Sequence, residues 1–143
     1  MNRKHMIRLA AAAALAFDAA GAFAQVAVVV GAKSPVGTMT SEQVSNVFLG
    51  KSNALPGGGT AVLGDLPDSS PTHELFYTKV TGKNSAQVKA AWSRLVFSGK
   101  ATPPKELATA ADVKKFVAAN PDAIGYIEKS AVDSSVKVVF SAD

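Results

Sequence analysis

Hydroxyl and acidic side chains gather at one strand-to-helix junction, within residues 65–76. A short apolar run ends there, a polar turn follows, and Ser70, Pro71 and Thr72 begin a segment with helical spacing. A helix start presents backbone N–H groups without intrahelical acceptors and the positive end of the helix dipole. Two hydroxyls beside such groups predict a site for a small anion. The alternative is ordinary capping of the helix by Ser70 with no ligand.

The same segment contains Ser70, His73 and Asp68, the three residue types of a nucleophilic triad. Residues this close in one turn rarely place an imidazole between a hydroxyl and a carboxylate. A nucleophile elbow of the G-x-S-x-G type is also missing from the sequence. We therefore expect a non-enzymatic protein, with His73 facing solvent on the first helical turn.

The composition gives little support to cofactor or metal chemistry. The sequence has no cysteine, which excludes disulfides, thiol catalysis and cysteine metal ligands, and it has only two histidines. The glycines at 57–59 are not followed by the lysine and hydroxyl of a phosphate-binding P-loop. We expect no cofactor and no metal.

Residues 1–24 have the pattern of a cleavable signal peptide. A basic start precedes an apolar run from Leu9 to Phe17, and the segment ends in Ala22-Phe23-Ala24. The run is shorter than the roughly 20 residues that span a bilayer. We expect cleavage after Ala24, no stable membrane insertion afterwards, and a single domain over residues 25–143. The remaining positive charge is small and does not indicate nucleic-acid binding.

The hydrophobic pattern of residues 25–143 predicts an α/β fold with one sheet flanked by helices. Trp92 lies on an apolar helical stripe and is expected to be buried, while Thr40 or Ser41, Ser70 and Ser85 are expected helix caps. The expected strands are Val26–Val30, Ala61–Leu66, Ala123–Ile127 and Val136–Phe140. The expected helices are Ser41–Leu49, Pro71–Val80, Ala86–Phe97 and Ala110–Ala119.

Several ordered motifs resemble the phosphate ABC transporter substrate-binding proteins of the periplasm, especially their small members. They are Met39–Val44, Val47–Lys51, Ala91–Lys100, Pro103–Lys105, Val117–Pro121 and Ala123–Tyr126. The resemblance extends from about Val26 to Phe140. It implies a type 2 periplasmic-binding-protein-like fold, of which this chain would form one lobe, and a periplasmic location.

The resemblance also implies where a ligand would bind. The family's phosphate loop, R-S-D-G-S-G-T, matches residues 66–72, with Leu66 in place of the arginine and Pro71 in place of the second glycine. It implies a small, phosphate-like oxyanion at Asp68, Ser69, Ser70 and Thr72. We expect Leu66→Arg to strengthen binding. The implied partner is an ABC permease or another envelope protein, and the alternative function is a ligand-free interaction module of the cell envelope derived from the same lobe.

Overall fold

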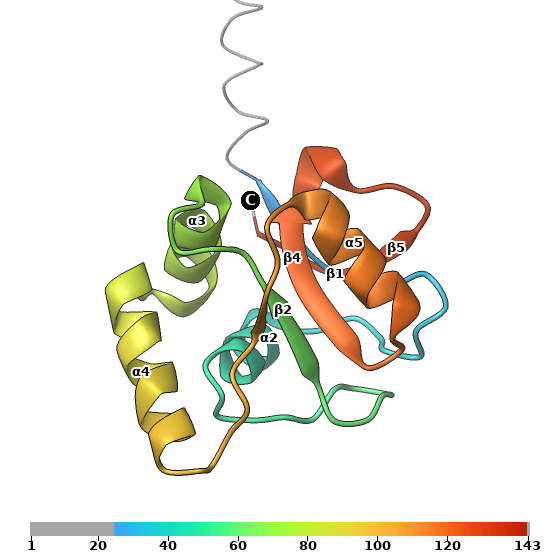
Figure 1. Cartoon of the computed structure of the whole chain (residues 1–143). Coiled ribbons are helices and arrows are strands. Elements are labelled where there is room, and N and C mark those ends of the chain that lie inside the picture. The colour runs from blue at the N-terminus through green and yellow to red at the C-terminus, as the bar shows by residue number, and fades with distance from the viewer. Residues whose placement is uncertain (1–24, 143) are drawn as a thin grey trace, which may run out of the picture.

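The computed structural model describes residues 25–142, so the predicted signal peptide lies outside the described residues. The described chain is an α/β fold with one mixed sheet of strand order β3-β2-β4-β1-β5 and helices packed against it (Figure 1). The strands are β1 Val26–Gly31, β2 Val62–Asp65, β3 Lys105–Glu106, β4 Ala123–Glu128 and β5 Val136–Ala142. The helices are α2 Ser41–Phe48, α3 Pro71–Thr81, α4 Ser85–Phe97 and α5 Ala110–Ala119. The predicted fold class is confirmed.

The four predicted strands and four predicted helices are present within a few residues of their expected ends. The structure adds the two-residue strand β3 and a 3₁₀ turn at Lys129–Ala131. One predicted cap is wrong: Asn84, not Ser85, caps α4, because its side chain accepts from the Gln87 N–H while the Gln87 side chain accepts from the Asn84 N–H. Thr40 caps α2 in the same reciprocal way.

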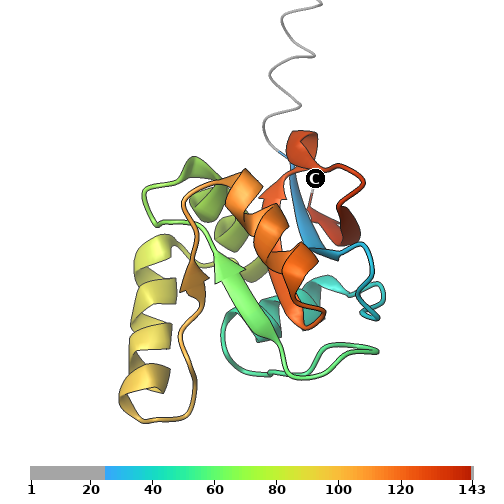
Figure 2. The same cartoon turned by 45° about the vertical axis from the view of Figure 1, so that its right-hand side comes forward.

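Strand β1 runs opposite to the other four strands of the sheet. β2 is parallel to both β3 and β4, whereas β1 is antiparallel to both β4 and β5. All five residues from Val26 to Val30 in β1 are fully buried, as expected for a central strand covered on both faces. The parallel strands end on the same side of the sheet, so the loop after β2 leads directly into α3 (Figure 2).

Helix α5 covers one face of the sheet at close range because glycines lie beneath it. A Cβ atom at Gly31 would lie 2.5 Å from the Val117 carbonyl oxygen, and one at Gly125 would lie 2.7 Å from a Val113 methyl group. At Gly31 the obstacle is the backbone of α5, so a side chain there would displace the helix, and at Gly125 the Val113 side chain would have to move. The glycines of β1 and β4 therefore allow α5 to pack close to the sheet.

An aromatic cluster fills the opposite face, between the sheet and helices α2 and α3. The rings of Phe76 and Tyr126 stack at 4.0 Å with 9° between their planes, and Phe48 packs edge-on against both. Tyr77 completes the cluster, and all four side chains are fully buried. Because successive residues of a strand face opposite sides, Gly125 supports α5 while Tyr126 supports α3.

Helix α4 packs beside α3 at the edge of the fold, away from the central strands (Figure 1). Trp92 connects it to α2: its indole N–H donates to the Phe48 carbonyl at 2.8 Å, and 9% of the residue is exposed. The predicted burial of Trp92 is confirmed. Within residues 25–142, no helix combines the length and apolar character needed to cross a bilayer.

Candidate functional site

The predicted anion site lies at the start of α3, where the loop after β2 turns into the helix. Ser70 occupies the N-cap position, but its side chain makes no capping hydrogen bond, and Pro71 is the first helical residue. Neither Ser69 nor Ser70 has a side-chain partner among the described residues. Both hydroxyls are therefore free to donate to a ligand.

Thr72 is less available than its two serine neighbours. The residue is buried, and its hydroxyl donates to the Glu128 carboxylate on β4 at 3.1 Å. Its backbone N–H has no acceptor in the described part of the chain, whereas the next N–H, of His73, donates to the Ser70 carbonyl at 3.1 Å. Thr72 can thus offer an anion its backbone N–H while its hydroxyl is engaged.

Asp68 lies on the exposed outer side of the turn. Its carboxylate is 4.0 Å from the Lys89 amine of α4, and both side chains are largely exposed, so this ion pair contributes little stability. Leu66, which stands at the position of the family's arginine, is buried in the core instead. An arginine at position 66 would replace a core side chain, which makes Leu66→Arg a poor probe of binding.

Asp65, at the end of β2, is the most connected polar group of this region, although no sequence pattern singled it out. Its carboxylate accepts hydrogen bonds from the Tyr77 hydroxyl at 2.8 Å, from the Tyr126 hydroxyl, and from the Leu66 N–H at 2.9 Å. Burial raises the pKa of Asp65, although the donated hydrogen bonds and nearby His73 oppose the shift. Burial and the Asp65 charge raise the pKa values of both tyrosines, which keeps the hydroxyls protonated as donors.

His73 is buried, so its predicted solvent exposure is wrong. It precedes Phe76 and Tyr77 by three and four residues on α3, which places its ring on the same side of the helix as the aromatic cluster. The His73 and Tyr77 rings lie 4.6 Å apart. Its Nε2 is 3.8 Å from Asp65 Oδ1, and its Nδ1 is 3.0 Å from the Ser85 hydroxyl oxygen.

The residue types of a catalytic triad therefore do come together here, in Asp65, His73 and Ser85. This set differs from Asp68, His73 and Ser70, the set considered from sequence spacing. The Ser85 hydroxyl, however, donates to the Glu74 carboxylate, and the Ser85 N–H donates to the same oxygen at 3.1 Å. These two bonds lower the pKa of Glu74 and hold it ionised. With its proton directed to Glu74, Ser85 connects α3 to α4 rather than presenting a nucleophile to the imidazole.

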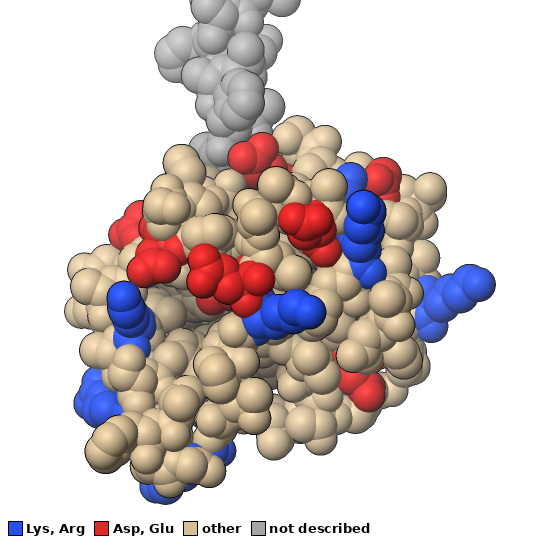
Figure 3. Space-filling view, in the orientation of Figure 1, with Lys and Arg blue, Asp and Glu red and all other residues tan. Residues whose placement is uncertain are grey.

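The electrostatic surroundings of the α3 start are acidic. Besides Asp68, three more carboxylates lie around the first turn of α3: Asp65 is 3.8 Å from His73, Glu128 accepts from Thr72, and Glu74 belongs to the turn and accepts from Ser85 of α4. Acidic side chains gather on this face of the molecule, above the ends of the parallel strands (Figure 3). The described residues contain no cluster of three or more histidine, cysteine and acidic side chains suited to a metal ion. The site combines anion donors with negative charge.

Comparisons by sequence find no matching protein-family model and no significant match among curated proteins. Comparisons by structure match 80% of this chain to solved binding proteins. A putative phosphate ABC transporter substrate-binding protein with bound phosphate from Clostridium perfringens has a TM-score of 0.64 at 24% identity. An ABC-type phosphate transport receptor from Vibrio cholerae gives 0.62 at 20% identity, and PstS from Borrelia burgdorferi gives 0.52 at 11%.

The match covers less than half of each of these proteins: 43%, 44% and 46% of their lengths, in the same order. At sequence identities below 25%, these structural matches show the fold but not the ligand of this chain. The chain has the fold of about one lobe of a phosphate ABC transporter substrate-binding protein.

Proposed function

We propose that this chain is an exported, periplasmic, non-enzymatic protein of the solute-binding type, related to phosphate ABC uptake, whose α3 start binds a small phosphate-like oxyanion. The observation that carries the proposal is the pair of unpartnered hydroxyls, Ser69 and Ser70, at the N-terminus of an 11-residue helix. The bound phosphate in the Clostridium perfringens protein, which shares this lobe, supports the choice of ligand.

The site would bind an oxyanion through neutral donors. The two serine hydroxyls and the Thr72 N–H can reach its oxygens, and the dipole of α3 favours negative charge there. Pro71 has no N–H to add, and the His73 N–H is already used by the Ser70 carbonyl. Asp68 forms one side of the turn and repels a fully ionised ligand. Protonated oxyanions are therefore preferred over more highly charged ones.

Binding at this site is expected to be weak, with Kd on the order of 1 mM, equivalent to about −4 kcal/mol. The donors are neutral, four carboxylates lie around the turn, and one lobe leaves the other side of the ligand in water. In water-exposed sites each hydrogen bond to the ligand largely replaces one to solvent. A second lobe or a partner that covered the ligand would strengthen every contact.

The two serines offer a clean test because neither side chain stabilises the fold through a hydrogen bond. The double variant Ser69→Ala/Ser70→Ala is expected to unfold at the same denaturant concentration as the wild type, within about 0.5 kcal/mol. Its phosphate affinity is expected to fall by at least about fivefold, as for the loss of two hydrogen bonds of about 0.5–1.5 kcal/mol each.

Phosphate titrations followed by backbone amide NMR measure this affinity and locate the site at once. Ser93→Ala, at an exposed position on α4, is the matched control and should bind phosphate as the wild type does. If the double variant and the control bind phosphate equally, or if the amides of residues 69–73 do not shift, the oxyanion proposal is wrong.

A second candidate function, an interaction module of the cell envelope, is favoured by one specific observation. The partly buried Asp65 carboxylate accepts hydrogen bonds from both tyrosine hydroxyls and from an N–H group, so the chain satisfies these donors with its own anion. Its partner would be an ABC permease or another envelope protein. A mature protein that binds no phosphate but is retained by a partner through the acidic α3 face would support this function over the first.

A further inference from the structure

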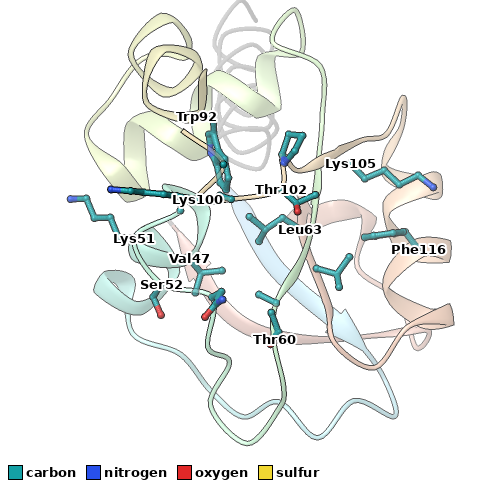
Figure 4. A pocket seen from close by; sticks show the side chains of 17 residues that line it. Val47, Lys51, Ser52, Thr60, Leu63, Trp92, Lys100, Thr102, Lys105 and Phe116 are labelled. Atoms are coloured by element: carbon teal, nitrogen blue, oxygen red, sulfur yellow. The ribbon is translucent and has the colours of Figure 1, made fainter. Parts of the chain in front are cut away.

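A second concave region lies between α4 and the β2–β3 edge of the sheet, apart from the α3 start. It has a volume of about 820 Å³, within the range of pockets that hold small organic molecules. The segment that connects α4 to β3 forms one wall, and the segment after α2 forms another (Figure 4). None of the residues of the α3 turn lines it.

The floor and one wall of this hollow are apolar. Val47 and Leu63 are buried residues that line it, and the Trp92 ring faces it from α4 (Figure 4). Phe116 of α5 closes the far side and lies beneath Lys105, whose amine is 5.6 Å from the ring centroid. Such a surface suits an aliphatic or aromatic group, which gains free energy on leaving water.

The charged side chains that line the hollow are all positive. They are Lys51, Lys100 and Lys105, with no aspartate or glutamate in the lining. None of the three amines forms an ion pair with another described residue. Lys51 and Lys100 lie on one side of the hollow and Lys105 on the other, and their amines are directed outward from its centre toward solvent (Figure 4). These long exposed side chains place positive charge at the rim of the hollow. An apolar floor with positive sides is complementary to a molecule with an apolar body and a negative head.

We propose that the hollow binds a small amphipathic organic anion, an aryl or alkyl carboxylate or phosphate. Its apolar body packs on Trp92 and Leu63, and its anionic group lies near Lys51 and Lys100. The two requirements are separate: inorganic phosphate lacks the apolar body, and a neutral analogue lacks the charge. This site is independent of the oxyanion proposed at the α3 start, since the two share no residue.

The test uses 4-phenylbutyrate as the probe and its neutral amide, 4-phenylbutyramide, as the matched comparison. Trp92 is the chain's single tryptophan and lines the hollow, so its indole N–H gives one NMR resonance that reports on this region. We expect 4-phenylbutyrate to shift this resonance and the amides of residues 99–103. The amide compound should bind at least about threefold more weakly, as expected for loss of two exposed charge contacts.

Lys51→Gln/Lys100→Gln is the decisive variant, with Lys79→Gln/Lys115→Gln as a control of equal charge change on other surfaces. The first variant should weaken 4-phenylbutyrate binding by about three- to tenfold, and the control should leave it unchanged at matched ionic strength. Equal binding of the acid and its amide overturns the proposal, as does an equal effect of the two lysine pairs. Shifts at residues 69–73 without any at Trp92 also overturn it, and leave the α3 oxyanion site standing.

Discussion

A strong anion site needs both fixed hydrogen-bond donors and positive charge. The α3 start has the donors, and the lysine-lined hollow has the charge. The α3 start has hydroxyls and N–H groups fixed by a helix, but carboxylates surround it. The hollow has three lysines that form no ion pair with another described residue, but their amines lie on flexible side chains at its rim. Donors held in fixed positions select a ligand by its geometry, whereas charges on mobile side chains select it only by the sign of its charge. A helix start without nearby positive charge is therefore expected to bind phosphate weakly.

The largest difference between the two regions is expected in their effect on stability. Phe76 stacks in the aromatic cluster that supports the α3 start, so Phe76→Ala should cost about 3–5 kcal/mol of unfolding free energy. Phe97, at the end of α4 near the hollow, is 96% exposed, and Phe97→Ser should change stability by less than about 0.5 kcal/mol. Urea unfolding followed by circular dichroism measures both, and similar losses for the two would contradict the assigned core.

A smaller loss is expected from Tyr126→Phe, which keeps the ring but removes a donor to Asp65. The partly buried Asp65 carboxylate would then lack one of its hydrogen bonds, at a cost of about 1–3 kcal/mol near neutral pH. The loss should shrink in acid, where Asp65 is protonated and can itself donate. A loss that stays constant with pH would show that the hydroxyl does not stabilise the ionised carboxylate.

The raised pKa of Asp65 predicts a distinct pH dependence of stability. At pH values above 3.8, the ordinary pKa of an aspartate, the folded protein holds the Asp65 carboxyl proton more tightly than the unfolded chain does. This contribution to stability is therefore full below pH 3.8 and is lost as the pH rises through the folded pKa. Asp65→Asn should flatten this part of the profile, measured by urea unfolding at a series of pH values. A profile unchanged by the substitution would contradict the assignment.

Elements of the fold could be predicted because their side chains repeat with regular periods. The continuous β-branched run at Val26–Val30 and the apolar stripe through Val88, Trp92 and Leu95 indicate a buried strand and a packed helix without knowledge of their partners. β3 could not be predicted, because Lys105–Glu106 has two exposed polar residues and is a strand only through its pairing with β2.

The site was only partly predictable, because its central contacts join residues distant in sequence. The helix start and its serines follow from local signals, and the structure places them together. The partners of Asp65 are Tyr77 and Tyr126, 12 and 61 residues away, and no local pattern connects them. The burial of His73 did have a local signal. His73 lies three and four residues before Phe76 and Tyr77, which places it on the apolar face of the helix.

If the α3 start binds oxyanions, local negative charge should limit its affinity. Asp68→Lys tests this most directly, because Asp68 is exposed, adjoins Ser69, and can be reversed in charge without entering the core. Glu42→Lys, an equal change at an exposed position on α2, is the control. Phosphate titrations by amide NMR should show affinity about three- to tenfold higher for Asp68→Lys than for Glu42→Lys, with shifts at residues 69–73. Equal affinities, or no shifts at those residues, would contradict the account.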